Sequence, residues 1–264
     1  TPLPDPADPF PTAGKIGSTD SLYLLGDHLE RFRERDRALE YWSEALSRDP
    51  GDTRCNTAMG LVMFKRGLFR EALTYMQTAL ERYPENAEAR YYRGLCHLVL
   101  DESDRAERQL NLASYNSGWY AAAHFELAQL TASKGRYWKA LEHIERCVRA
   151  NADNMQALAL KAMILNRLGC YEQALAVCDS VQRTDRLDLL SAAERSVAAD
   201  GLELKNVAAT ALDSLLEITR LDGRNHLELA VRYARCGQYR DASGVLELAL
   251  EHGLNPATRQ NDLP

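Results

Sequence analysis

The apolar positions of the chain repeat with a period of 34 residues, and residues 53–86 show the pattern most clearly. This segment has the pattern of two amphipathic helices, with small residues where the helices would touch and larger apolar residues around them. The small residues are Gly60, Ala72 and Ala79, and the larger ones are Met59, Met63, Phe69, Met76 and Leu80. Gly67 lies between the two helices and Pro84 follows the second. Because Gly adopts the left-handed conformation that ends a helix and Pro cannot continue one, the segment predicts a helical hairpin.

The same pattern runs through seven repeats without an insertion. The repeats begin at Thr19, Thr53, Ala87, Ala121, Met155, Leu189 and Gly223. Their twentieth residue is always Ala: Ala38, Ala72, Ala106, Ala140, Ala174, Ala208 and Ala242. Their eighth residue is always small: Gly26, Gly60, Gly94, Ala128, Ala162, Ser196 and Ala230. Small residues at both positions let two antiparallel helices approach closely, so we predict an all-α, right-handed α-solenoid of seven helical hairpins.

Capping residues and glycines mark the expected ends of these helices. The residue before each repeat is usually a helix N-cap type: Ser18, Asp52, Asn86, Asn154, Asp188 and Asp222, with Tyr120 as the exception. Glycine lies between the paired helices in four repeats, at Gly67, Gly135, Gly169 and Gly237. The sixth repeat is the least regular, and its Asp200-Gly201 pair predicts a longer or bent connection and looser packing.

The ends of the chain differ in composition from the repeats. Residues 1–18 are rich in proline and predict an extended linker, residues 19–256 hold the repeat array, and residues 257–264 form a polar tail. The chain starts at Thr1 with no apolar signal segment, and its last helix has leucines on more than one face. We therefore expect the natural protein to continue beyond this sequence.

The repeated positions resemble the tetratricopeptide repeat, whose pattern is an apolar or aromatic residue followed by Leu-Gly, Tyr, Ala, Phe, Ala and Pro. The first repeat matches it with Leu22, Leu25-Gly26, Leu29, Ala38, Trp42, Ala45 and Pro50. The resemblance covers residues 19–256. It implies a scaffold that binds other proteins, and the fold alone does not specify which ones.

A narrower resemblance lies in two segments, GDHLERFRERDRALEYWSEALSRDPGDTRCNTAMGLVMFKRGLFREA (26–72) and YNSGWYAAAHFELAQL (115–130). They are similar to a bacterial family in which a repeat array follows a galactose-mutarotase-like β-sandwich domain of unknown function. This resemblance implies that the proline-rich start is the junction to such a domain. Any carbohydrate chemistry of that domain lies outside this chain.

Composition excludes several classes of function. A net charge of −6 argues against a nucleic-acid partner, because such proteins present a basic face. The chain has no apolar run near the ~18 residues of a membrane span. Its six cysteines have no zinc spacing, and several fall at small core positions. We therefore predict reduced, buried thiols and a cytoplasmic location.

No set of residues in the sequence has the pattern of a catalytic or metal site. The six histidines are scattered through different repeats, and neither a zinc-protease motif nor a phosphate-binding loop occurs. Carboxylate pairs such as Asp36 with Glu40 have the spacing of a solvated helix face. We therefore predict no catalytic residue, no metal and no cofactor.

The expected binding surface is the inner face of the array, which the first helix of each repeat lines. The residues that we expect to contact a partner are Tyr23, Asp27, Arg54, Phe64, Tyr91, Leu95, Phe125, Gln129, Met163 and Asn166. This set is acidic at its amino-terminal end and aromatic to apolar in the middle. It predicts a partner with basic residues at one end and an apolar stretch at the centre. The alternative is that part of this stripe packs between neighbouring repeats.

Two functional hypotheses follow. In the first, the chain is a non-catalytic scaffold whose inner face holds a protein segment or the protein's own missing amino-terminal domain. In the second, it is an accessory region of a carbohydrate-active enzyme whose catalytic β-sandwich lies outside this chain. An enzyme within the chain itself is the weakest hypothesis, because no nucleophile–base pair can be assembled.

Overall fold

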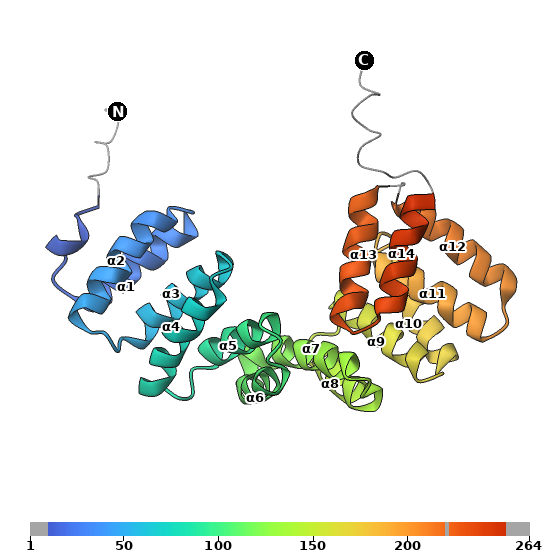
Figure 1. Cartoon of the computed structure of the whole chain (residues 1–264), viewed down its shortest axis with the longest axis horizontal. Helices are drawn as coiled ribbons and strands as arrows, with labels where there is room; N and C mark the ends of the chain where they lie inside the picture. Colours follow the sequence, from blue (N-terminus) through green and yellow to red (C-terminus); the bar gives the residue numbers. More distant parts are fainter. Residues whose placement is uncertain (1–9, 220–221, 252–264) are drawn as a thin grey trace, which may run out of the picture. The chain divides into compact units, whose positions relative to one another are not determined.

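The structure is a computed structural model that describes residues 10–219 and 222–251. Within these residues it contains fourteen α-helices and one short 3₁₀ helix, η1 (Ala13–Lys15), and no strand. The helices form seven antiparallel hairpins, each made of two consecutive helices packed side by side (Figure 1). The predicted all-α solenoid of helical hairpins is confirmed. The predicted polar tail and the last residues of the array lie outside the described residues.

The chain divides into two compact units, residues 1–113 and 114–264. The amino-terminal unit contains α1 (Thr19–Arg31), α2 (Arg35–Arg48), α3 (Thr53–Lys65), α4 (Phe69–Arg82), α5 (Ala87–Val99) and α6 (Ser103–Ala113). The carboxy-terminal unit contains α7 (Ser117–Ser133), α8 (Tyr137–Ala150), α9 (Met155–Arg167), α10 (Tyr171–Thr184), α11 (Leu189–Gly201), α12 (Lys205–Thr219), α13 (Gly223–Arg235) and α14 (Tyr239–Glu251).

The first helix of each repeat begins at a capping side chain. All six predicted N-caps accept a hydrogen bond from a backbone N–H of the first helical turn, as Asp52 Oδ1 does from Cys55 N at 2.8 Å. In the fourth repeat α7 begins a turn earlier, at Ser117, because Asn116 Oδ1 accepts from Gly118 N at 3.0 Å. Tyr120, the exception in the sequence pattern, therefore lies inside α7.

The turn inside every hairpin uses one left-handed residue at the same place in the repeat. Four of these seven residues are the predicted glycines. The other three are Arg33, Asp101 and Glu203, with φ of 65°, 58° and 60°. The sixth repeat therefore has the same short connection as the others, and the expectation of a longer or bent one near Gly201 is wrong. Gly201 instead accommodates the ring of Tyr171, which would lie 2.7 Å from an added Cβ.

In the first three hairpins the small eighth residue lies directly against a bulky side chain of the second helix. An added Cβ on Gly26 would lie 2.3 Å from Trp42 Nε1, and one on Gly60 would lie 2.7 Å from Met76 Cε. Six of the seven alanines at the twentieth position are buried: Ala38, Ala72, Ala106, Ala140, Ala174 and Ala242.

Helix α12 departs from this packing. It buries Ala211, Leu215 and Thr219, whereas Ala208 is half-buried and Leu212 is exposed. Its buried face is therefore displaced along the helix, and the expectation that Ala208 is a buried contact is wrong. The looser packing expected of the sixth repeat stays a prediction.

Part of the predicted linker packs on the first hairpin instead of extending away from it. Tyr41 OH donates to the Pro11 carbonyl oxygen at 2.6 Å, and Arg48 Nη1 donates to the Ile16 carbonyl oxygen at 2.7 Å. Residues 1–9 lie outside the described part of the chain.

Candidate functional site

The residues expected on the inner face divide between the two units. Tyr23, Asp27, Arg54, Phe64, Tyr91 and Leu95 belong to the amino-terminal unit, and Phe125, Gln129, Met163 and Asn166 belong to the carboxy-terminal unit. Each unit has a cavity that the first helices of its own repeats line.

The amino-terminal cavity brings Tyr23, Asp27 and Arg54 together. It has a volume of about 220 Å³ between α1, α3 and α5, and Glu30, Leu61 and Glu88 also line it. The Arg54 guanidinium lies over the Tyr23 ring, with its Cζ 5.0 Å from the ring centroid. Arg54 also pairs with Asp20 and Asp52. These contacts hold Tyr23 and Arg54 in place at one side of the cavity.

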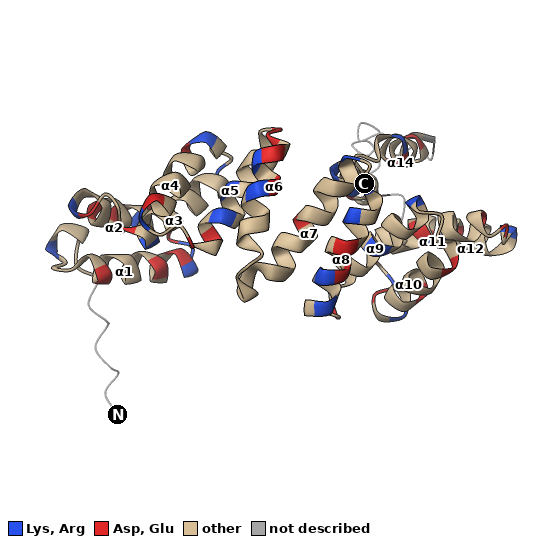
Figure 2. Ribbon diagram, turned by 90° about the horizontal axis from the view of Figure 1, so that it is seen from below, with Lys and Arg blue, Asp and Glu red and all other residues tan. Residues whose placement is uncertain are grey.

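Carboxylates dominate the electrostatics of this cavity, and α1 carries acidic residues along its length (Figure 2). Burial raises the pKa of Glu88, the charge of Asp27 raises it further, and Lys65 opposes both. Lys65 itself is paired with Glu30, with Nζ 2.9 Å from Oε1. Within residues 10–219 and 222–251, Glu88 has no hydrogen bond or ion pair.

Phe64, Tyr91 and Leu95 do not line this cavity. All three are half-buried. The Phe64 ring packs against Phe69 and Tyr92, with centroids 5.6 and 5.5 Å away, and Tyr91 packs edge-on against Tyr92 at 5.4 Å. Part of the predicted stripe therefore packs between neighbouring helices, and a contact with a partner stays a prediction for these residues.

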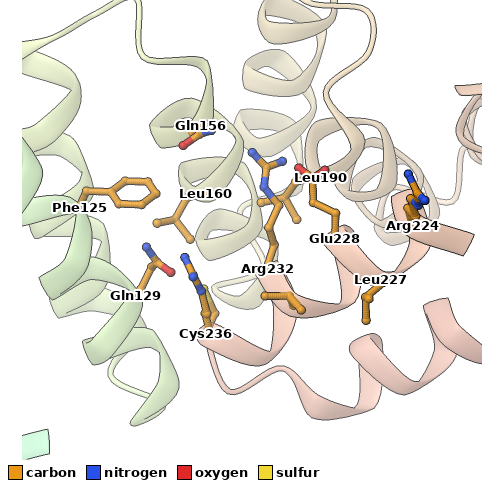
Figure 3. A pocket seen from close by; sticks show the side chains of 12 residues that line it. Phe125, Gln129, Gln156, Leu160, Leu190, Arg224, Leu227, Glu228, Arg232 and Cys236 are labelled. Atoms are coloured by element: carbon orange, nitrogen blue, oxygen red, sulfur yellow. The ribbon is translucent and has the colours of Figure 1, made fainter. Parts of the chain in front are cut away.

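The carboxy-terminal cavity is larger, about 450 Å³, and lies between α7, α9, α11 and α13. The predicted residues Phe125 and Gln129 line it together with Gln156, Leu160 and Leu190. Phe125 points into the cavity from α7, and Arg232 extends into it from α13 (Figure 3). Helix α13 completes the lining with Arg224, Leu227, Glu228, Val231, Arg232, Arg235 and Cys236 at its carboxyl end.

Met163 and Asn166 do not reach this cavity, and their expected place on a binding surface is wrong. Met163 is fully buried in the core. Asn166 is also buried, and its Nδ2 donates to Glu194 Oε2 at 2.7 Å. Because α11 packs along α9, the part of the predicted face that holds Met163 and Asn166 is covered inside the unit, whereas Gln156 near the start of α9 stays exposed at the cavity.

The position of α13 depends on a contact between the seventh and fourth repeats. Gly237 lies against Ser133, whose Cα and carbonyl oxygen would both be 2.9 Å from an added Cβ. Gln238 Nε2 donates to Tyr137 OH at 3.0 Å, and Arg167 Nε donates to Gln238 Oε1 at 2.8 Å. The last hairpin thus packs back on the first hairpin of the unit, which makes a cavity from what would otherwise be an open groove.

The sequence contained a signal for the residues of α13 that the prediction omitted. Arg224, Leu227 and Val231 hold the second, fifth and ninth positions of the seventh repeat. These are the positions that the inner-face rule uses in the earlier repeats. The contribution of Arg235 and Cys236, in contrast, depends on the contact with the fourth repeat, which no pattern within a repeat indicates.

The cysteines are the other candidate reactive groups, and their role is structural. All six cysteines are free, and five are buried, while Cys170 is half-buried. Burial raises the pKa of the Cys55 and Cys236 thiols to about 12 and that of Cys147 to about 11. The prediction of unpaired, mostly buried thiols is confirmed. In the described ranges, no three His, Cys, Asp or Glu side chains are placed to hold a metal ion. No helix among them is both long and apolar enough to cross a membrane.

The comparison with known families agrees with the fold. The tetratricopeptide repeat family matches residues 57–122 and 125–188. Residues 57–122 and 125–188 therefore match tetratricopeptide repeats, which as a class form scaffolds that bind proteins or peptides. Tetratricopeptide repeat protein 21B of Mus musculus is 28% identical over an alignment of 166 residues, and the match covers 59% of this chain and 12% of that protein. The match thus spans a small part of this relative.

Similar solved structures share the fold at low sequence identity. PilF of Pseudomonas aeruginosa has a TM-score of 0.66 at 19% identity, over 77% of this chain and 91% of that chain. A tetratricopeptide repeat protein from Parabacteroides merdae has a TM-score of 0.64 at 15% identity, over 88% and 98%. YrrB, a repeat protein described as having an unusual peptide-binding site, has a TM-score of 0.61 at 19% identity, over 69% and 94%.

Proposed function

We propose that the chain is a non-catalytic scaffold that holds an extended protein segment against the first helices of its repeats. The observation that carries this proposal is the amino-terminal cavity, which Asp27, Glu30 and Glu88 line together with one cation, Arg54. Arg54 is already paired with Asp20 and Asp52. The peptide-binding site described for YrrB, which has the same fold, supports a peptide as the kind of ligand.

The chemistry of this cavity fits a lysine or arginine side chain of the partner. Among the described residues, Asp27 pairs with the exposed Arg31 alone, at 2.8 Å, and the half-buried Glu88 has no partner. A cation placed between the two carboxylates would form charge-assisted hydrogen bonds with them. It would also offset the hydration that the Glu88 carboxylate loses by being half-buried. The Tyr23 ring offers a face for the stem of the same side chain.

The aromatic and apolar residues of the predicted inner face indicate a second property of the partner, an apolar stretch. We propose that Phe64, Tyr91 and Leu95 contact an apolar stretch of the segment. In the carboxy-terminal unit, taken by itself, Phe125 and Gln129 are proposed to contact a bound segment as well. The rings of Phe64, Tyr91 and Phe125 are half-buried, and aromatic side chains that keep part of their surface exposed near polar groups are typical of the anchor points of protein interfaces.

The test uses fluorescence anisotropy with a labelled peptide of alternating Lys and Leu and the full chain. Glu88→Gln removes the unpaired charge and keeps the shape, and Glu40→Gln removes an exposed charge on the outer helix α2. We expect Glu88→Gln to weaken binding about tenfold, because one charge-assisted contact is lost, and Glu40→Gln to leave it unchanged. Equal affinities of the two variants, or no binding by the natural sequence, would contradict the proposal.

The occupant of the inner face in the whole protein is a further part of this proposal. A separate protein and the protein's own amino-terminal domain would both fit a site for an extended segment. The resemblance to proteins with a galactose-mutarotase-like domain stays a prediction, and so do the accessory role in a carbohydrate-active enzyme and the cytoplasmic location.

A further inference from the structure

We propose that the carboxy-terminal cavity binds a protein segment in which an acidic residue adjoins a bulky apolar one. This inference rests on the proposed scaffold function and assigns a second site of opposite charge preference. The amino-terminal cavity is lined by carboxylates, whereas three arginines of α13 line the carboxy-terminal one: Arg224, Arg232 and Arg235. The two cavities therefore favour ligand groups of opposite charge.

The arginines differ in how far their charge is already neutralised. Arg232 Nη1 lies 2.9 Å from Oδ2 of the buried Asp188, so this ion pair is part of the fold. For the guanidinium groups of Arg224 and Arg235, the described ranges contain no ion-pair or hydrogen-bond partner. Both side chains are exposed at the cavity, where the one carboxylate of the lining is Glu228. A carboxylate from a partner would therefore find at least one unpaired guanidinium.

The apolar part of the lining has the form of a contact surface rather than of a core. Leu227 and Val231 leave 55% and 44% of their surface exposed, although α13 buries Leu229 and Tyr233 on its other side. Phe125 and Leu160 face this side of α13 across the cavity (Figure 3). Large apolar side chains that remain exposed beside a cavity mark a place where apolar surface of a ligand can be buried.

Two amides favour a polypeptide as the ligand. Gln129 on α7 and Gln156 on α9 both line the cavity, and each amide offers donors and an acceptor. A peptide backbone presents N–H and C=O groups at regular spacing, so these amides can pair with it between the apolar and the basic contacts. A cavity of about 450 Å³ has the size of an ordinary ligand site and accepts a short stretch of side chains.

The contact between the seventh and fourth repeats makes the site possible. Gln238 bonds to Tyr137 and Arg167, and Arg167 Nη2 lies 2.8 Å from Asp241 Oδ2. These bonds hold the start of α14, and with it α13, against α8 and α9. The basic residues of α13 therefore face Phe125 of α7, a residue three repeats earlier in the chain.

The test measures the anisotropy of three labelled peptides of equal length with the full chain: alternating Glu and Leu, Glu and Ser, and Lys and Leu. We expect the Glu–Leu peptide to bind more tightly than the Glu–Ser peptide, because both the charge and the apolar side chains are needed. The double variant Arg224→Gln/Arg235→Gln should weaken the Glu–Leu peptide by about tenfold or more. The matched control Arg240→Gln, an exposed arginine of α14, should not change its affinity.

The outcomes separate this inference from the proposed function. If the Lys–Leu peptide binds but the Glu–Leu peptide does not, the scaffold function stands and the inference is wrong. Equal binding of the Glu–Leu peptide by the double variant and by Arg240→Gln would also overturn it. Val231→Ser should lower the affinity for the Glu–Leu peptide and leave the affinity for the Lys–Leu peptide unchanged. An equal loss of affinity for both peptides would likewise contradict the inference.

Discussion

Glu194 on α11 is fully buried, and its Oε2 accepts a hydrogen bond at 2.7 Å from Asn166 Nδ2 on α9. The guanidinium of Arg167 is its nearest cation, with Nη2 3.9 Å from Oε1. Burial raises the pKa of Glu194, against the opposing effects of Arg167 and Asn166. A carboxylate in the centre of the carboxy-terminal unit thus joins the helices that surround the cavity.

The first prediction concerns the pH dependence of stability. The native state keeps the Glu194 proton to a higher pH than the unfolded chain does, since its folded pKa is raised. The free energy of unfolding should therefore fall as pH rises from the ordinary glutamate range toward the raised pKa, by at most about 1.4 kcal/mol per pH unit. Urea unfolding followed by circular dichroism at several pH values measures this slope.

Glu194→Gln is the variant that isolates this group, because its amide oxygen can still accept from Asn166. The slope should be smaller in the variant than in the natural sequence. Glu88, whose pKa is also raised by burial, is the control: Glu88→Gln should remove a separate part of the slope. An unchanged slope in Glu194→Gln would show that the carboxylate is already ionised across this range.

The second prediction concerns the left-handed turn residues. Arg33 and Glu203 adopt φ of 65° and 60° at exposed positions where four other repeats have glycine. A left-handed non-glycine residue costs about 1–2 kcal/mol, and glycine costs about 0.5–1 kcal/mol of chain entropy. Arg33→Gly and Glu203→Gly should therefore each stabilise the fold by about 0.5–1 kcal/mol in urea unfolding.

Gly67→Ala is the reverse experiment at the same place in the repeat. Gly67 has φ of 78° and no atom within 4 Å of an added Cβ, so any loss of stability reflects backbone conformation alone. The expected loss is about 1 kcal/mol. A neutral Gly67→Ala together with a neutral Glu203→Gly would disprove the conformational explanation.

The third prediction concerns the contact between the seventh and fourth repeats. Cys236 is buried beside this contact, and its thiol pKa of about 12 makes the reactive thiolate rare in the native state. In the natural sequence the half-buried Cys170 should react with iodoacetamide before the other five cysteines. Gln238→Ala removes the bonds to Tyr137 and Arg167, and it should increase the reaction rate of Cys236 roughly tenfold through local opening.

Mass spectrometry of the alkylated peptides identifies which cysteine has reacted. Cys147, buried on α8 in the same unit, is the internal control and should keep its slow rate. If Gln238→Ala increases the alkylation rates of Cys147 and Cys236 equally, the variant has destabilised the whole unit. The contact would then not stabilise the surroundings of Cys236 locally.

The helices were predictable from the sequence because their signals are local. The caps at Asp52 and Asn86 and the glycine at Gly67 lie within a few residues of the ends that they define. The predicted start of the fourth repeat at Ala121 was wrong because another local signal was stronger. Asn116 caps α7, so the helix begins about one turn earlier.

The candidate sites were only partly predictable, because they depend on which helix faces cover one another. Tyr23, Asp27 and Arg54 converge because α1 and α3 belong to neighbouring repeats, as the pattern assumes. Met163 and Asn166 hold equivalent positions but are covered by other helices of the unit. The cavity residues Arg235 and Cys236 require a contact between repeats that are not neighbours, and a pattern of one repeat carries no information about it.

The contact of Gly237 and Gln238 with the fourth repeat also limits how this unit can evolve. In an open array each hairpin touches only its neighbours, so a hairpin can be duplicated or lost while the others keep their surroundings. In the carboxy-terminal unit, removing one hairpin between α8 and α13 would shorten the arc that brings Gln238 to Tyr137. The number of hairpins between them is therefore fixed by geometry, and length variation in related proteins should fall outside residues 117–251.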